Sequence, residues 1–375
     1  MTWAVLACGA IVVVTEPLTI ALLRRLMVID LPGHRSSHSV PTPRGGGAPI
    51  ALGLLVATVL ATALGSRQLP HPVPGASGEA LAFGFAVAFF GVLGLIDDLR
   101  GLPASGRLVL QAAGSAFVAG MLAGRLDLPV PVLVVIAVAI MVWLAGFVNA
   151  FNFMDGVNGI SGAHALIGGV AYACLGQWRH DAFMVTAGLA VAAAACAFLP
   201  WNAFRARVFL GDVGSYSLGA ALALLAACAV LRGVPVEAAA GPVALYLADT
   251  AWTLLRRIRR GENWLEPHRT HVYQRWCDVG WSHQEVSLLT AGCTVLLCLL
   301  GTVSAVGAAP ARLAADLAGV AVLVAYLRSP ELMGRPRTER ARHANPYSHA
   351  LLPARDGCPA GPAIGARANV GRRRR

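Results

Sequence analysis

Lysine is absent from this chain of 375 residues, and charged residues of every kind are scarce. They make up 13% of the chain, about half the share of a soluble domain, whereas hydrophobic residues make up 57% and the mean hydropathy is +0.64. So little polar sequence is poorly suited to covering the apolar core of a soluble protein. The composition therefore indicates an integral membrane protein.

The eight cysteines are scattered, and most of them lie inside apolar segments. They form no CxxC pair and no Cys/His spacing typical of zinc or of a disulfide framework, so we interpret them as small hydrophobic residues. A nucleic-acid-binding motif is missing too. The net charge of +11 is therefore interpreted as membrane topology and contact with anionic lipid or phosphate.

Apolar runs near 20 residues long predict membrane-spanning helices. We expect an all-α integral membrane protein, a polytopic helical bundle with about 11 transmembrane helices and cytoplasmic active-site loops. The predicted spans are 3–23, 47–64, 80–96, 108–123, 129–147, 159–175, 183–199, 214–231, 235–255, 286–307 and 311–327. Residues 1–327 would form this membrane domain, and residues 328–375, rich in Arg, Pro and Gly, are expected to be a disordered tail.

The distribution of the 30 arginines predicts the orientation of the chain in the membrane. Loops after even-numbered spans hold five of them: Arg67, Arg125, Arg179, Arg232 and Arg312. The others lie mainly in loops after odd-numbered spans and in the tail. The positive-inside rule therefore places these loops and the tail in the cytoplasm and the N-terminus outside.

Polar residues gather on the predicted cytoplasmic side in five stretches: Asp30–Gly47, Gly94–Leu102, Asn149–Gly159, Phe209–Ser215 and Glu266–Arg275. In the first, Gly45–Gly47 either leave backbone N–H groups free to approach a ligand or form a flexible linker. In the second, Asp97 and Asp98 end a predicted helix, where carboxylates oppose the helix dipole. A cation such as magnesium would relieve their repulsion, although a solvated helix end is the alternative.

The third and fourth stretches place polar side chains at the ends of predicted spans. Asn149, Asn152 and Asp155 recur every three residues, so they share one broad face if the segment is helical. Such groups at membrane depth indicate function, with hydrogen bonding between helices as the alternative for one amide. Asp212, beside glycines before the next span, either caps a helix or holds a metal or phosphate.

The fifth stretch is basic. His268, Arg269, His271 and Arg275 are expected to form a cationic cluster that suits a diphosphate, unless they are simply part of a positive cytoplasmic loop. Asp249 lies inside a predicted span, where an acid is costly unless it is paired or faces a cavity. We expect it to face the site or to balance nearby arginines.

In this order, the stretches resemble the polyprenyl-phosphate N-acetylaminosugar-1-phosphate transferases, polytopic bacterial enzymes that move a sugar phosphate from a UDP-sugar onto a lipid phosphate. The resemblance covers roughly residues 1–327 and rests on PTPRGGG (41–47), GLIDDLRGL (94–102), NAFNFMDGVNG (149–159), FLGDVGS (209–215), ADT (248–250) and PHRTHVYQR (267–275). The last of these is more similar to the branch that starts O-antigen or other surface polysaccharides than to the peptidoglycan branch.

The resemblance implies roles for these motifs. One of Asp97 and Asp98 would accept a proton from the lipid phosphate, Asp212 would bind Mg²⁺ (or Mn²⁺), and Phe209 would stack on uracil. The full expected site comprises the catalytic residues Asp97, Asp98, Asp155, His268 and His271, the metal ligands Asp212 and Asp155, and the substrate-binding residues Arg44, Asn149, Asn152, Asn158, Phe209, Arg269 and Arg275. Asn158 departs from the family pattern, because many relatives have a second Asp there.

The expected partners are a UDP-N-acetylaminosugar, polyprenyl phosphate and the lipid bilayer of the bacterial cytoplasmic (inner) membrane, with no nucleic acid; a homodimer is left open. The sequence leaves two alternative functions open. One is the peptidoglycan-precursor phospho-MurNAc-pentapeptide transferase of the same family. The other is a membrane transporter, although transporters tend to place polar groups near the midplane and to show internal repeats.

Overall fold

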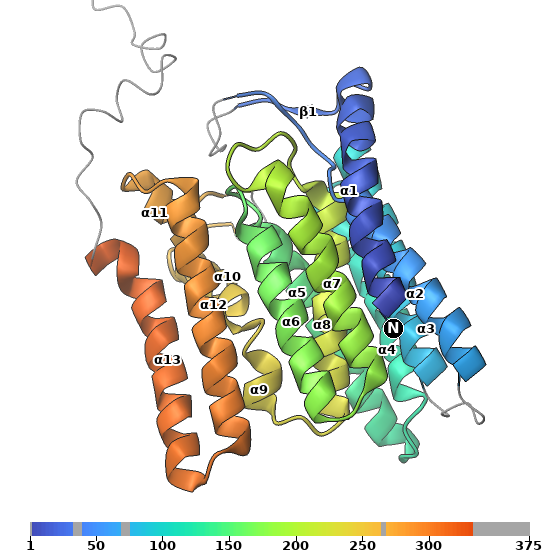
Figure 1. Ribbon diagram of the computed structural model, residues 1–375. Coiled ribbons are helices and arrows are strands. Elements are labelled where there is room, and N and C mark those ends of the chain that lie inside the picture. The colour runs from blue at the N-terminus through green and yellow to red at the C-terminus, as the bar shows by residue number, and fades with distance from the viewer. Residues whose placement is uncertain (1, 33–39, 69–75, 264–267, 333–375) are drawn as a thin grey trace, which may run out of the picture. The chain divides into compact units, whose positions relative to one another are not determined.

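Long helices dominate the part of the chain that the computed structural model describes, residues 2–32, 40–68, 76–263 and 268–332 (Figure 1). They are α1 (Thr2–Arg25), α2 (Ala48–Gln68), α3 (Ala76–Arg100), α4 (Ala104–Ala123), α5 (Val130–Met154), α6 (Ile160–Trp178), α7 (Ala182–Asn202), α8 (Gly211–Leu231), α9 (Val236–Ala240), α10 (Ala244–Arg259), α11 (Val272–Asp278), α12 (His283–Val306) and α13 (Ala309–Leu332). A short antiparallel sheet pairs β1 (Ile29–Asp30) with β2 (Thr42–Pro43). The predicted all-α class is confirmed.

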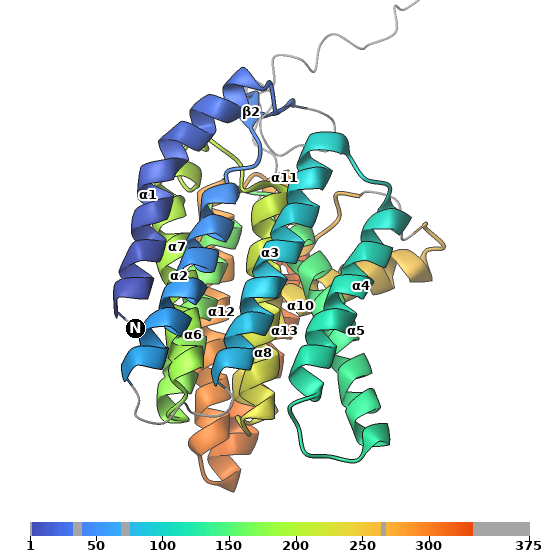
Figure 2. The same ribbon diagram turned by 90° about the vertical axis from the view of Figure 1, so that its right-hand side faces the viewer.

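Helix α8 lies inside the bundle and is buried along almost its whole length (Figure 2). It contacts α2, α3, α5, α6 and α7. Its sequence is rich in alanine and glycine, and small residues let neighbouring helices approach closely in a membrane protein. A Cβ added at Gly47 would overlap the backbone of Gly214, and one added at Gly94 would overlap the backbone of Asp212. The first turn of α8 is therefore held tightly between the start of α2 and the end of α3.

Eight of the described helices are long and apolar enough to cross a membrane: α1, α3, α4, α5, α7, α8, α12 and α13. Large apolar side chains on α5 and α13, such as Val135 and Leu313, are exposed on the outside of the bundle. In water such a surface would be unfavourable, whereas lipid tails solvate it. The chain is a multi-pass membrane protein, and the count of eleven spans stays a prediction.

The ninth predicted span, residues 235–255, is wrong as a single helix. The structure divides it into α9 and α10, which are joined by a turn at residues 241–243. Pro242 explains the break, because proline lacks a backbone N–H and disfavours helical backbone in the residue before it. The second piece, α10, is strongly amphipathic and ends in arginines, so it suits the membrane surface better than a full crossing.

The sheet and α11 lie at one end of the bundle, away from the N-terminus at the start of α1 (Figure 1). Four of the five polar stretches also reach this end, because they connect or terminate α2, α3, α5, α6 and α8. The predicted tail begins inside α13, which ends at Leu332, and residues 333–375 lie outside the described part of the chain.

Candidate active site

Two motifs that are far apart in the sequence, PTPRGGG and FLGDVGS, are paired backbone to backbone. The N–H groups of Gly45–Gly47 donate to the carbonyls of Phe209 and Leu210 over 2.8 to 3.2 Å. The expectation that these N–H groups are free to bind a ligand is therefore wrong. Their partners come from a segment that sequence inspection could not place beside them, and the pairing fixes Arg44 next to the first turn of α8.

Asp98 reaches from the end of α3 to the N-terminus of α8. One carboxylate oxygen accepts the N–H of Asp212 and the other accepts the N–H of Val213, both at 2.9 Å. Nε of Arg44 lies 2.7 Å from the same carboxylate, which is 1% exposed. The dipole of α8 stabilises an acid at this position, which offsets the unfavourable position at the end of α3. Asp98 thus ties three segments together and does not line the cavity described below.

Asp97 has hydrogen-bond partners of its own, different from those of Asp98. Its carboxylate accepts the N–H of Leu102 at 2.8 Å, the hydroxyl of Tyr216 at 2.9 Å and the guanidinium of Arg107 at 3.1 Å. Each acid of the pair therefore has its own arginine, and a guanidinium relieves the repulsion that was expected to need a metal. Asp97 does not line the cavity either, so the geometry gives no support to a proton-accepting role for the pair.

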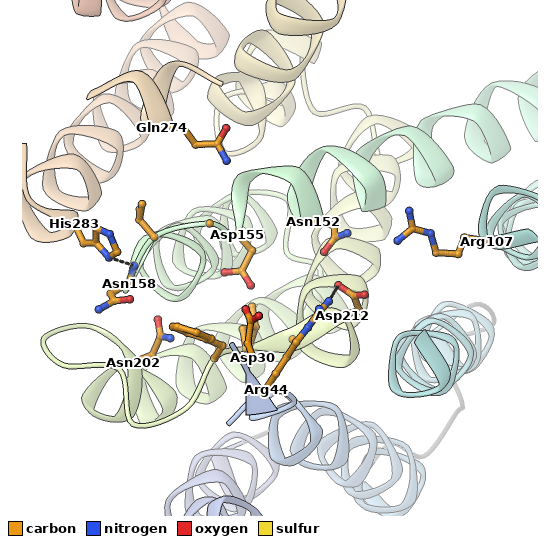
Figure 3. A pocket seen from close by; sticks show the side chains of 15 residues that line it. Asp30, Arg44, Arg107, Asn152, Asp155, Asn158, Asn202, Asp212, Gln274 and His283 are labelled. Carbon is orange, nitrogen blue, oxygen red and sulfur yellow. Dashed lines mark hydrogen bonds and ion pairs between the residues drawn. The ribbon is translucent and has the colours of Figure 1, made fainter. Parts of the chain in front are cut away.

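A cavity of about 360 Å³ opens beside the first turn of α8 (Figure 3). It gathers predicted residues from three motifs: PTPRGGG before α2, NAFNFMDGVNG and FLGDVGS. The lining residues are Asp30, Arg44, Arg107, Asn152, Asp155, Gly156, Val157, Asn158, Asn202, Phe209, Leu210, Gly211, Asp212, Gln274 and His283. Six predicted site residues are thus brought together: Arg44, Asn152, Asp155, Asn158, Phe209 and Asp212.

Three carboxylates, those of Asp30, Asp155 and Asp212, and two guanidinium groups, those of Arg44 and Arg107, line this cavity. Nη2 of Arg44 lies 2.8 Å from Oδ1 of Asp212, so the plain capping role considered for Asp212 does not apply (Figure 3). Asp155 ends α5 and is half-buried. Burial raises the pKa of Asp155 to about 6, although Arg44 lowers it in part. A cation close to Asp155 would lower this pKa and favour the ionised carboxylate.

The donor atoms of the cavity fit a magnesium ion that also binds substrate. Within the described ranges, no group of three or more His, Cys, Asp or Glu side chains forms a closed metal site. Mg²⁺ commonly uses only one or two protein carboxylates and completes its shell with water and phosphate oxygens. Asp212 and Asp155 supply hard oxygen ligands of this kind, and Oδ1 of Asn152, which accepts a hydrogen bond from Ser215 at 2.8 Å, lies with them.

The three predicted asparagines have different places. Nδ2 of Asn149 donates to Gln111 at 2.6 Å and joins α5 to α4, which is the structural alternative considered for one amide. Asn152 and Asn158 both line the cavity. The N–H of Asn158 donates to Nδ1 of His283 at 3.3 Å, and its carbonyl accepts the hydroxyl of Ser287 at 2.7 Å. The start of α12 therefore fixes the loop that presents the side chain of Asn158.

The predicted histidines His268 and His271 do not line the cavity. Nδ1 of His271 is 3.0 Å from Oδ1 of Asp249, whose other oxygen accepts the hydroxyl of Tyr326 at 2.9 Å. Asp249 thus orients His271, and hydrogen bonds satisfy its buried carboxylate. His268 stacks on His271 with ring centroids 4.9 Å apart. Burial, followed by the nearby His271 and Arg257, lowers the pKa of His268 to about 4, so His268 is neutral at pH 7 and the expected cationic role is wrong for it.

Arg269 and Arg275 are not brought to the cavity. They line a second, smaller concavity with arginines of α10. Helix α11 separates the two hollows: Gln274 faces the first and Arg275 the second. The structure therefore divides the fifth polar stretch between two places.

Sequence reasoning missed several residues that shape the cavity. Asn202, at the end of α7, accepts the N–H of Gly159 at 2.7 Å and donates to the carbonyl of Val208 at 3.0 Å. His283 and Gln274 also line the cavity. An amide directly at the end of an apolar span was the available signal for Asn202. His283 gave none, because one histidine at a helix start is commonplace.

Comparisons with known proteins agree with this geometry. The profile of glycosyl transferase family 4 matches residues 80–230. The chain is 31% identical over 305 residues to the decaprenyl-phosphate N-acetylglucosaminephosphotransferase of Mycobacterium leprae. This alignment covers 72% of this chain and 74% of that protein. The chain belongs to glycosyl transferase family 4. This membership confirms the resemblance to the polyprenyl-phosphate aminosugar-1-phosphate transferases and rules against the transporter alternative.

Other relatives differ in how much of the chain they match. The probable undecaprenyl-phosphate N-acetylglucosaminyl 1-phosphate transferase of Bacillus subtilis is 25% identical over 292 residues, 73% of this chain and 76% of that protein. The phospho-N-acetylmuramoyl-pentapeptide-transferase of Streptococcus thermophilus is 28% identical over 214 residues, 52% of this chain and 61% of that protein. The likeness to the peptidoglycan branch is therefore the shorter one.

Proposed function

We propose that the protein transfers an N-acetylaminosugar 1-phosphate from a UDP-sugar to polyprenyl phosphate, releasing UMP, as the first membrane step of a cell-surface polysaccharide. The observation that carries the proposal is the cavity at the first turn of α8, where Arg44, Asp155, Asp212 and Phe209 meet. The longer match to relatives named for N-acetylglucosamine favours that sugar over a muramoyl pentapeptide.

The reaction joins two polyanions. An oxygen of the lipid phosphate attacks the β-phosphorus of the donor, a new P–O bond forms, and the bond to the UMP oxygen breaks. The main demand is therefore electrostatic. Arg44 meets it with a guanidinium held at the cavity wall by Asp98 and Asp212. Phe209, at the same cavity, offers an aromatic face for the uracil.

Asp212 and Asp155 are the residues that would hold Mg²⁺ (or Mn²⁺) together with the donor diphosphate. The ion would neutralise phosphate charge and stabilise the leaving UMP. A protein base is not essential, because the second pKa of a phosphate monoester is about 6 and the acceptor is mostly dianionic at pH 7. This is consistent with Asp97 and Asp98 being used as supports of α8.

The test is UMP release by purified protein in detergent with polyprenyl phosphate, Mg²⁺ and a panel of UDP-N-acetylated sugars. We expect release to require the lipid acceptor and the metal. Asp212→Asn should slow it by about 100-fold or more, because one group that acts on the transferring phosphate is lost. Asp127→Asn, at an exposed loop acid away from the cavity, should leave it unchanged. Folded protein that releases no UMP from any donor would contradict the proposal.

A further inference from the structure

A second hollow, here called the arginine pocket, lies between the end of α10 and α11 and has a volume of about 210 Å³. Five arginines line it: Arg256, Arg257, Arg260, Arg269 and Arg275. None of them lines the cavity at the first turn of α8, here called the donor cavity. The two hollows therefore share no lining residue, and the proposed transfer reaction gives the arginine pocket no role.

The acids around the arginine pocket do not balance its arginines. Glu262 lies 3.0 Å from Arg257, Asp278 lies 3.3 Å from Arg269, and Glu331 lies 3.2 Å from Arg275. Among the described acids, the remaining two arginines, Arg256 and Arg260, approach only ones that are already paired, each at 3.9 Å. The described surroundings of the pocket thus hold five guanidinium groups and three carboxylates, which leaves an excess of positive charge.

Two further features indicate that this excess is directed at a ligand. Burial, followed by repulsion from Arg275 and Arg260, lowers the pKa of Arg256 below its ordinary value. Nη1 of Arg275 is buried and has no hydrogen-bond partner among the described residues. A buried donor without a partner costs free energy, and an anion in the pocket would supply both the charge and the acceptor.

The neighbouring surface of α10 indicates where such an anion would come from. Leu255 and Ile258 are exposed beside the arginines, with 40% and 53% of their surface accessible. Apolar and basic side chains side by side on an amphipathic helix are typical of the boundary between lipid tails and headgroups. The dipole at the end of α10 explains the presence of basic residues there, but it does not explain why they line a hollow.

We propose that the arginine pocket is a phosphate-binding site separate from the donor cavity. Guanidinium groups bind phosphate oxygens through paired N–H donors, and several converge here. The position at the membrane boundary favours the headgroup phosphate of an anionic lipid, and free phosphate has the same recognition chemistry. Because α11 presents Gln274 to one hollow and Arg275 to the other, a bound phosphate would also fix one wall of the donor cavity.

The experiment titrates the purified full-length chain in neutral detergent and follows the thermal unfolding midpoint. The ligands are short-chain phosphatidylglycerol, short-chain phosphatidylcholine as the neutral control, and inorganic phosphate. A ligand that binds the folded state raises the midpoint with concentration, which gives its apparent Kd. Arg256→Gln should weaken the binding about tenfold, the loss expected for one charge-assisted contact. Arg259→Gln removes the same charge from an exposed position of α10 outside the pocket and should bind as the wild type does.

The outcomes separate the two sources. Stabilisation by phosphatidylglycerol alone identifies a lipid headgroup, and stabilisation by inorganic phosphate as well identifies a general phosphate site. The proposal is overturned if neither ligand stabilises the protein, or if Arg256→Gln and Arg259→Gln respond alike. Arg260→Gln, at a mostly exposed side chain, replaces Arg256→Gln if that variant does not fold. No donor or polyprenyl phosphate is present, so the result is independent of the proposed transferase reaction.

Discussion

At the scale of single residues, the site depends on two arginines that pair with buried acids. Arg44 lies 2.7 Å from Asp98 and 2.8 Å from Asp212, so one guanidinium connects α3, α8 and the segment before α2. Arg107 lies 3.1 Å from Asp97 and connects α4 to α3. A chain without lysine uses the planar guanidinium here, and this group can contact two carboxylates at once.

His268 allows a prediction about pH. Its pKa is lowered to about 4 in the folded protein, against an ordinary value of 6.5. Between these values the unfolded chain binds the proton more readily, so stability from His268 is complete above pH 6.5 and is lost as pH falls toward 4. We expect the unfolding midpoint of the wild type to fall by several degrees between pH 7 and pH 4.5, and that of His268→Asn to fall less. His180→Asn, at an exposed position, is the control, and an equal fall in all three proteins would contradict the assignment.

At the scale of elements, the junction of α3 with α8 is the most constrained part of the fold. Asp98→Asn should destabilise the protein by about 3 kcal/mol, because one buried oxygen acceptor and the charge facing Arg44 are both lost. The replacement amide would also place N–H donors against the N–H of Asp212 or Val213. Chemical unfolding in detergent measures the difference, with Asp127→Asn as the matched control. A loss below about 1 kcal/mol, the size of an ordinary exposed ion pair, would show that the capping contact is unimportant.

The sequence predicts elements better than it predicts their partners. Apolar runs located the long helices because a span needs a continuous stretch of about 20 residues. The same criterion failed at 235–255, where Pro242 interrupts an apolar run without changing its average composition. Six residues of the motifs lie together at one cavity: Arg44, Asn152, Asp155, Asn158, Phe209 and Asp212. The motifs could not show that the carbonyls of Phe209 and Leu210 satisfy the glycine N–H groups, because that contact depends on how distant helices pack.

At the scale of the whole molecule, both hollows lie at one end of the bundle. The donor cavity is lined by the loop before α6 and by the start of α8, and the arginine pocket is lined by the end of α10. The N-terminus of α1 lies toward the other end (Figure 1). This arrangement agrees with the arginine distribution, which places the polar loops on one side of the membrane and the N-terminus on the other.

Topology reporters test this orientation and the proposed donor together. Fusions placed after Gly261, beyond α10, should give a fluorescent GFP and an inactive alkaline phosphatase in a bacterial host, because GFP matures in the cytoplasm and the phosphatase only outside it. Fusions placed after His180, in the turn between α6 and α7 at the opposite end, should give the reverse. A UDP-sugar is made inside the cell, so the cavity must open there for the proposed reaction. Active phosphatase after Gly261 would place both hollows outside and would exclude a nucleotide sugar as the donor, whatever the chemistry of Arg44 and Asp212 allows.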